Sequence, residues 1–212
     1  MTSLLSQQSF AAPQGAGEWA GAARLCFRQG EEIYAQDETA DLIYRLVRGA
    51  VRTSHLLADG RRQIGDFYYE NDVIGVETGA THRFSAEALG DCEVLAIRRS
   101  GSTACETGRL ERVIWQATTA ELGRAQSHML LLGRATACER VARFLLDIAA
   151  RFRGEIVALP MSRQDMADYL GLTIETISRM LGRLQAAGLV EFLGARRYRI
   201  RRFSALSDMA AA

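Results

Sequence analysis

The 212-residue sequence has no long hydrophobic run and no leader pattern at its N-terminus. No apolar stretch approaches the roughly 20 residues that a membrane span requires. Residues 1–22 are mostly small and polar, and no basic segment precedes their few apolar side chains, so a secretory signal is not expected. We therefore predict a flexible N-terminal tail over residues 1–22 and a cytoplasmic protein that makes no membrane contact.

Cysteine and histidine are scarce, with four and three residues respectively. The cysteines are widely spaced and form no CxxC pair, whereas zinc sites usually draw their ligands from close pairs. A metal site is therefore not expected, and the thiols of a cytosolic chain should stay reduced. Redox tuning through Cys105 or Cys138 stays open as an alternative.

The short motifs that commonly carry catalysis are also absent. The sequence contains no GxSxG, P-loop or HExxH motif and no paired-carboxylate motif. The strand-like part of the chain offers no evident pair of nucleophile and base. An enzyme is therefore not expected.

Lysine is absent, so all 26 basic side chains are arginines, and their distribution is uneven. Residues 1–135 contain 14 Arg against 17 Asp plus Glu, a balance of −3. Residues 136–212 contain 12 Arg against 8 Asp plus Glu, a balance of +4. This asymmetry favours a C-terminal region that meets a polyanion.

Short strand-like segments separated by glycines occupy residues 23–106. The stretch IYRLVRGAVRTSHLL alternates apolar and polar positions, and the Asp59-Gly60 dipeptide that follows is typical of a hairpin. CEVLAI, at residues 92–97, has the apolar character of a buried strand. The pattern predicts an α+β protein whose N-terminal part is a β-roll, or jelly roll.

A helical period replaces the strand pattern over residues 107–136. Six residues recur at alternating spacings of three and four: Trp115, Thr118, Leu122, Ala125, Met129 and Leu132. A helix over residues 107–136 that carries this seam would be more than about 35 Å long at 1.5 Å per residue, longer than a small β-roll covers. Packing on the chain's own β-roll stays an alternative, but we favour a homodimer in which two copies share the seam. His128 lies beside the seam and is expected to be a polar residue of the same interface.

Residues 137–212 predict helices followed by a β-hairpin. Ser162 with Asp165 three residues later is close to a capping box, which marks a helix start. Gly171 ends that helix, and a second helix follows at residues 173–187. The arginine-rich stretch LVEFLGARRYRIRR then predicts two strands. Helix, glycine turn, helix and hairpin form the layout of a winged helix-turn-helix.

The helix predicted at residues 173–187 has two different faces. Its apolar residues form a stripe that should face a core: Ile174, Ile177, Leu181 and Leu184. Glu175, Ser178 and Arg179 lie three and four residues apart and share another face. Arginine can donate two hydrogen bonds to guanine, and glutamate can accept one from cytosine. Although an ordinary surface Glu–Arg pair has the same spacing, the adjoining helix and hairpin favour a helix that reads DNA bases.

The stretch LPMSRQDMADYLGLTIETISRMLGRLQAAGLVEF resembles the DNA-binding domain of the CRP/FNR family of bacterial regulators. E-T-I-S-R, at residues 175–179, is similar to the E-x-x-S-R signature of the FNR and FixK branches, and ERVARFLL is similar to FixK proteins. The resemblance covers almost the whole chain. It implies a dimeric regulator, expected to be an activator that contacts RNA polymerase, whose Glu175, Ser178 and Arg179 read the half-site TTGA of a palindrome ending in TCAA.

The same resemblance implies which side chains contact the DNA backbone. Free N–H groups at helix N-termini favour phosphate binding there, and arginines of the hairpin can add further contacts. The expected phosphate contacts are Ser162, Arg163, Gln164, Thr173, Thr176, Arg196 and Arg197, with Arg199 as a further candidate.

Family members that bind cyclic nucleotides hold the phosphate with a G-E-L-G cassette followed by an Arg-Ser pair. D-V-I-G at residues 72–75 places Val73 where the ribose-binding glutamate would be, and Arg83-Phe84 replaces Arg-Ser. Cyclic nucleotide binding is therefore not expected, and Arg83 should be a surface residue or an intramolecular partner.

Oxygen-sensing members of the FNR branch bind an iron–sulfur cluster through an N-terminal cysteine group. Only Cys26 lies before residue 90, and a cluster takes about four thiolates. We therefore expect a regulator without a cofactor, as the FixK branch implies. The alternative is a ligand-gated sensor of the same family, responding to nitric oxide through haem or to another small effector.

Overall fold

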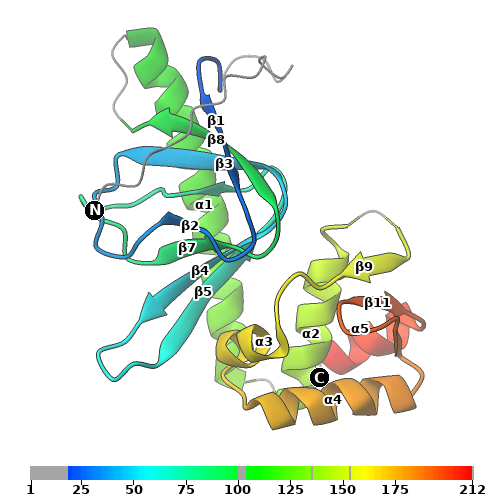
Figure 1. Ribbon diagram of the computed structural model, residues 1–212. Helices are drawn as coiled ribbons and strands as arrows, with labels where there is room; N and C mark the ends of the chain where they lie inside the picture. Colours follow the sequence, from blue (N-terminus) through cyan, green and yellow to red (C-terminus); the bar gives the residue numbers. More distant parts are fainter. Residues whose placement is uncertain (1–18, 100–103, 135, 153, 212) are drawn as a thin grey trace. The chain divides into compact units, whose positions relative to one another are not determined.

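The computed structural model describes residues 19–99, 104–134, 136–152 and 154–211 (Figure 1). Most of the predicted N-terminal tail and the side chain of Cys105 lie outside the described residues. Among the described helices, none combines the length and the apolarity that a membrane crossing requires.

The chain divides into two compact units. Unit 1 comprises Met1–His55 and Gly65–Glu121, and unit 2 comprises Leu56–Ile64 and Leu122–Ala212. The tip of one hairpin, Leu56–Ile64, thus belongs to the same unit as the C-terminal part of the chain.

Unit 1 is built on two four-stranded antiparallel sheets, with strand orders β1-β8-β3-β6 and β2-β7-β4-β5 (Figure 1). The strands are β1 (Ala23–Phe27), β2 (Glu32–Tyr34), β3 (Leu42–Arg48), β4 (Val51–Leu56), β5 (Arg62–Tyr68), β6 (Val73–Ile74), β7 (Ser85–Ala88) and β8 (Cys92–Arg98). Residues from both sheets form one shared apolar core. The predicted β-roll is therefore confirmed.

The alternating side chains of β3 and β8 explain how one sheet serves two cores. Successive residues of a strand point to opposite faces. Tyr44 and Val94 therefore lie in the core between the sheets, whereas Ile43 and Leu95 face the other side. There they pack with Leu110 of α1 (Ala104–Arg134), so the first part of this long helix covers the outer face of the sheet.

Trp19 adds to the same outer layer. Its side chain is 7% exposed and belongs to the cluster that contains Ile43 and Leu95. Packing in unit 1 thus begins before residue 23, where the sequence had placed the end of the flexible tail.

Unit 2 contains a winged helix-turn-helix. Its elements after α1 are α2 (Ala137–Ala149), β9 (Ile156–Ala158), α3 (Arg163–Leu170), α4 (Ile174–Ala186), β10 (Val190–Phe192), β11 (Arg197–Ile200) and α5 (Phe203–Ala211). The strands form a small antiparallel sheet of order β10-β11-β9. The sequence did not predict α5.

The core of unit 2 forms around α2. Thr136 and Glu139 make a capping box that starts the helix, and Val141, Leu145 and Ile148 lie buried on one side at helical spacing. This side packs against α4 and α5. The helix therefore supports the element that carries the predicted DNA-reading residues.

Candidate DNA-binding surface

The first helix of the motif, α3, starts at a complete capping box. Ser162 Oγ accepts a hydrogen bond from the backbone N–H of Asp165 at 3.0 Å, and Asp165 Oδ2 accepts one from the Ser162 backbone N–H at 2.9 Å. The Ser162 hydroxyl also donates to Asp165 Oδ2 at 2.8 Å. Both donors of Ser162 are thus already engaged within α3. Ser162 is therefore the helix cap, and its contact with phosphate stays a prediction.

Gly171 makes the tight turn between α3 and α4. Its backbone has φ 62° and ψ 40°, a left-handed conformation that favours glycine. Arg140 of α2 donates hydrogen bonds at 3.0 Å to the carbonyls of Leu170 and Leu132, which lie in the last turns of α3 and α1. Together these contacts stabilise the turn. The role of Arg140 could not be predicted from the sequence, because its partners are backbone atoms of other helices.

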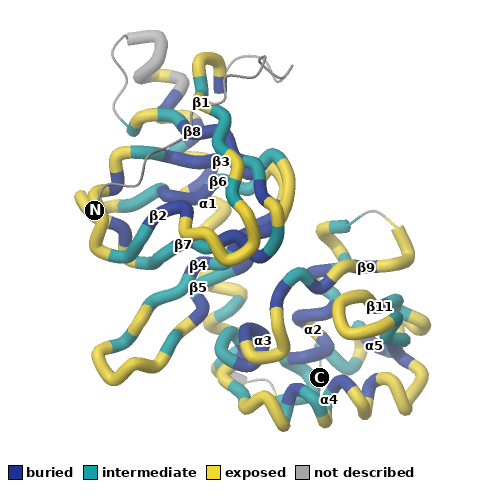
Figure 2. The backbone as a smooth tube through the Cα atoms, viewed as in Figure 1, coloured by how far each residue is buried: buried dark blue, intermediate teal, exposed yellow. Residues whose placement is uncertain are grey.

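Helix α4 has one buried side and one exposed side (Figure 2). Thr173 caps its start by accepting from the Thr176 backbone N–H. The buried residues of the predicted stripe are Ile177, Leu181 and Leu184. Ile174 was predicted to join them, but it is 39% exposed because it lies in the first turn, beyond the reach of the core.

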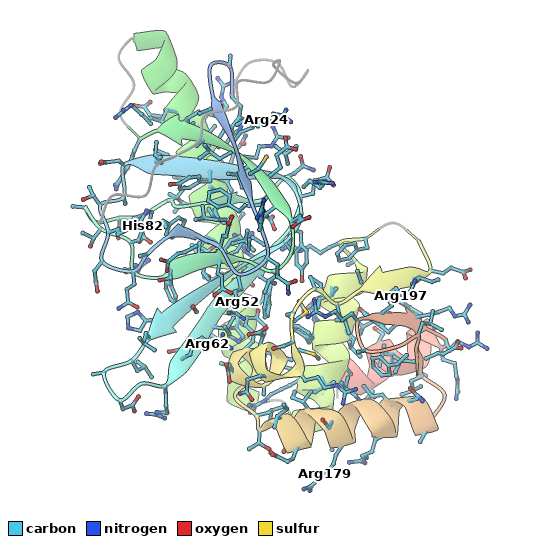
Figure 3. The ribbon with its side chains drawn as sticks, viewed as in Figure 1. Arg24, Arg52, Arg62, His82, Arg179 and Arg197 are labelled. Atoms are coloured by element: carbon cyan, nitrogen blue, oxygen red, sulfur yellow. The ribbon has the colours of Figure 1, made fainter. Side chains whose placement is uncertain are left out.

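The predicted base-reading residues lie on the opposite side of α4 from the buried stripe. Glu175 and Arg179 are exposed, and Ser178 is half-buried. Figure 3 shows Arg179 projecting away from the helices that α4 packs on. Hydrogen bonds from the backbone N–H of Glu175 and from the Thr173 side chain hold the pKa of Glu175 below its usual range, and the charge of Arg179 adds to this effect. The carboxylate is therefore ionised at neutral pH and can accept hydrogen bonds.

The predicted phosphate contacts on α3 and α4 are held in place by neighbours. Arg163 Nη1 donates to Ser178 Oγ at 3.3 Å, which joins the two helices on their exposed side. Gln164 Nε2 donates to Asp168 Oδ1 at 2.6 Å. Thr173 Oγ1 and Thr176 Oγ1 lie 3.1 Å apart. The structure thus brings these residues together with the base-reading residues on one surface.

The hairpin of β10 and β11 forms the wing. Tyr198 is fully buried and its hydroxyl donates to the carbonyl of Leu145 in α2, which anchors the hairpin. Arg196 and Arg197 are exposed, as a backbone contact requires. Arg199 instead donates to Glu191 Oε2 at 2.7 Å, so it stabilises the hairpin and is a poor candidate for phosphate binding.

The predicted dimer seam on α1 is largely uncovered. Trp115, Leu122 and Met129 are 74%, 57% and 66% exposed, and Thr118 and Ala125 between them are also exposed. The sixth member of the seam, Leu132, is half-buried within its own unit. A regular apolar stripe of this length on one face of a helix is a surface that another element can cover.

His128 does not belong to this exposed seam. Its Nε2 lies 2.8 Å from the carbonyl oxygen of Tyr169, and the two rings stack with centroids 4.0 Å apart. The imidazole thus has a partner in α3 of its own chain, which the sequence did not predict, and its place in a dimer interface stays a prediction.

The arginine at the predicted effector position has an intramolecular partner. Arg83 donates to Glu77 Oε2 from Nε and to Glu77 Oε1 from its backbone N–H, both at 3.2 Å, which confirms the prediction. Phe84 packs edge-on against His55. No group of three or more possible metal ligands occurs among the described residues.

One buried and one half-buried histidine, His82 and His128, predict a loss of stability in acid. His82 is 2% exposed and stacks on Tyr34, and burial lowers the pKa of His82, although Glu77 and Glu38 act in the opposite direction. Burial also lowers the pKa of His128. Since the unfolded chain protonates near pH 6.5 and the folded chain resists protonation, stability is retained above that pH and lost as the pH falls below it.

We therefore expect the thermal midpoint of unfolding to be lower at pH 5.5 than at pH 7.5. Thermal melts monitored by circular dichroism at these two pH values will measure the difference, with the doubly substituted His82→Phe, His128→Phe protein as the comparison. The difference should be smaller in this variant. An equal difference in both proteins would show that other groups cause it.

Two family models match the chain in the same order as its domains. Residues 24–104 match the cyclic nucleotide-binding domain, and residues 139–209 match the Crp-like helix-turn-helix domain. The nitrogen fixation regulation protein FixK of Azorhizobium caulinodans is 45% identical over 188 residues, which cover 85% of this chain and 76% of that protein. FixK of Rhizobium meliloti is 40% identical over 184 residues, covering 86% and 85%.

A solved structure shows the same architecture. The structure of FixK2 from Bradyrhizobium japonicum covers 90% of this chain and 98% of its own, with a TM-score of 0.84 and 47% sequence identity. A β-roll, a long helix and a winged helix-turn-helix with an exposed polar face define a DNA-binding transcription regulator. The chain belongs to the CRP/FNR family of such regulators, and the relatives reported above place it beside the FixK proteins.

Proposed function

We propose that this protein is a homodimeric transcription activator that binds a TTGA…TCAA palindrome and needs no small effector. It acts in the cytoplasm on chromosomal DNA and contacts RNA polymerase at the promoters that it activates. One relative named as an activator is the transcriptional activatory protein AadR of Rhodopseudomonas palustris, 40% identical over 186 residues.

The exposed face of α4 carries this proposal. Glu175 and Arg179 are one helical turn apart on a helix whose opposite side is buried, so their polar groups can enter the major groove together. An ionised carboxylate accepts from cytosine N4, and a guanidinium donates to guanine O6 and N7. This pair of chemistries fits the G·C pair within TTGA.

A dimer accounts for both the seam and the palindrome. Leu122 lies seven residues from Trp115 and from Met129, so the three exposed side chains repeat at the heptad spacing of a coiled coil. Two copies related by a two-fold axis present two recognition helices, which read half-sites whose centres lie about 34 Å apart.

Effector independence is supported by the residues that the β-roll carries at the positions where other family members bind a cyclic nucleotide. The positive charge of Arg83, the remaining basic residue at the predicted phosphate position, is paired with Glu77. Val73 is apolar and cannot accept a hydrogen bond from a ribose hydroxyl, and Phe84 occupies the place of a donor. These residues give a nucleotide few of the contacts that would hold it.

The first test is direct binding of the purified protein, without added ligand, to a labelled TTGA/TCAA duplex. Fluorescence anisotropy at fixed salt should show a preference of at least about 1,000-fold over a scrambled duplex. The measurement is made in air, so that an oxygen-sensitive cofactor cannot assist binding. Absorbance near the haem Soret band of the same sample tests for bound haem.

Tight binding to the palindrome by protein without a Soret band supports both parts of the proposal. Specific binding that appears only when an effector is added would support the proposed operator sequence but reject effector independence. Equal affinity for the two duplexes under all conditions would reject the half-site.

A further inference from the structure

Two adjacent arginines at the tip of the β4–β5 hairpin have different partners. Arg61 pairs through Nε with Asp59 Oδ2 at 2.7 Å inside the turn, and its side chain is 78% exposed. Arg62 is only 29% exposed, and it reaches α3 in the same unit (Figure 3). The pairing of Arg61 therefore stabilises the turn alone, whereas Arg62 connects the tip to the helix-turn-helix.

Arg62 binds two carboxylates on consecutive turns of α3. Its Nη2 lies 2.7 Å from Asp165 Oδ1 and 2.8 Å from Asp168 Oδ2, and its Nε lies 3.3 Å from Asp168 Oδ2. The side chains of Asp165 and Asp168 are 2% and 16% exposed. Buried carboxylates need a counter-charge, and Arg62 supplies one to both.

Each of these carboxylates also holds a residue at the start of α3. Asp165 accepts from Ser162 in the capping box. Asp168 Oδ1 accepts from Gln164 Nε2 at 2.6 Å. Arg62 is therefore linked through Asp168 to a predicted phosphate contact and through Asp165 to the cap that starts the helix.

The charge of Arg62 matters because α3 must approach DNA. Two uncompensated carboxylates beside the helix N-terminus would repel phosphates and oppose the favourable dipole. With Arg62 in place, the acidic pair is largely neutralised and its oxygens are used for internal hydrogen bonds.

We propose that Arg62 is a positioning residue for the DNA-binding surface: it holds Asp165 and Asp168 so that the start of α3 can accept the DNA backbone. This inference rests on the proposed function, because it presupposes that the helix-turn-helix binds the operator. It assigns part of the operator affinity to a hairpin residue that contacts no base. The recognition of base sequence stays with α4.

The test compares Arg62→Met with Arg61→Met, which removes the same charge from the neighbouring residue. Arg62→Met should weaken binding to the TTGA/TCAA duplex at least about 10-fold, with the ranking of base variants unchanged, while Arg61→Met should change it less than about 2-fold. Equal losses in the two variants, or no loss in Arg62→Met, would overturn the proposal.

Asp168→Asn separates positioning from a direct contact of Arg62 with DNA. If Arg62 acts by compensating the two carboxylates, then Arg62→Met should weaken binding less when it is combined with Asp168→Asn, because only Asp165 is then left without its counter-charge. If Arg62 itself contacts phosphate, the loss will be the same in both backgrounds, and the proposal fails. Arg62→Lys keeps the positive charge but lacks the planar guanidinium that donates to two carboxylates. It should therefore show an intermediate loss of DNA affinity, even if Arg62→Met folds poorly.

Hydrogen exchange of the free proteins provides a measurement that does not depend on the half-site. Amides of α3 should exchange faster in Arg62→Met than in wild type, while those of α2 and α5 should be unchanged. If the wild-type protein shows no preference for TTGA, the proposed function fails, but faster exchange of α3 in Arg62→Met would still support the positioning role of Arg62. Unchanged α3 exchange would overturn the positioning role itself.

Discussion

Replacing Leu122 with glutamate is expected to convert the proposed dimer to monomers and to weaken binding to the proposed palindrome by about 100-fold or more. Leu122 lies midway between Trp115 and Met129, the other two large exposed side chains of the seam on α1. In a two-fold dimer the residue at the centre of the seam lies close to its own copy. The substitution would therefore bring together two carboxylates in an apolar contact, where like charges repel strongly.

Sedimentation velocity will measure the oligomeric state, and fluorescence will report on the seam. The chain has two tryptophans, Trp19, which is buried in unit 1, and Trp115, which is exposed on α1. Dilution of the wild-type dimer should therefore shift the emission of Trp115 to longer wavelength. The monomeric variant should show the shifted emission at every concentration.

Ala120→Glu is the matched control for this experiment. Ala120 is exposed on the same helix, and two residues of helix turn it about 200° away from Leu122. This variant adds the same charge outside the seam, so it should remain dimeric and bind the palindrome normally. A Leu122→Glu protein that sediments as a dimer and binds like wild type would show that the seam is not the interface.

The features predicted well from the sequence are those that depend on a few neighbouring residues. Ser162 and Asp165 form the predicted capping box, and Gly171 has the left-handed backbone expected of a helix-ending glycine. The Asp59-Gly60 turn likewise joins β4 and β5 as predicted. Each of these features satisfies a local backbone requirement, so the residue types and their spacing are sufficient evidence.

Contacts between distant segments could not be predicted in the same way. Arg62 is 103 and 106 positions away from its partners Asp165 and Asp168. Nothing in the neighbouring sequence distinguishes it from any other arginine near a hairpin turn. The partner of His128 was missed for the same reason, since helical periodicity locates this histidine beside the seam but does not reveal Tyr169, 41 positions away. Side-chain partners across the fold depend on how helices pack, which a periodic pattern does not specify.

The exposure of individual side chains is a second property that the sequence pattern does not predict. Ile174 has the correct spacing for the buried stripe of α4, yet it occupies the first turn and remains 39% exposed. Arg199 has the same charge as Arg196 and Arg197 but pairs with Glu191 across the wing. Composition identifies an arginine-rich hairpin, whereas the direction of each side chain decides which arginines can reach DNA.

Replacing Arg179 with alanine is expected to cost about 1–3 kcal/mol of binding free energy at the TTGA/TCAA duplex and to relax the preference at its G·C pair. Arg179 is exposed on α4, and its guanidinium can donate two parallel hydrogen bonds to guanine. Without it, duplexes that carry another base pair at this position should bind nearly as well as the original. Anisotropy titrations against duplexes with single base-pair changes will measure this preference.

Arg183→Ala provides the comparison that separates base reading from general attraction. Arg183 is exposed one helical turn further along α4, so its removal takes the same charge from the same helix. It should weaken all duplexes to a similar degree and make binding less sensitive to salt, because the loss of a positive charge near the DNA affects every sequence alike. If Arg179→Ala produced this same uniform loss and kept the preference for G·C, Arg179 would be a backbone contact. Base reading at this position would then have to be assigned to Glu175 or Ser178.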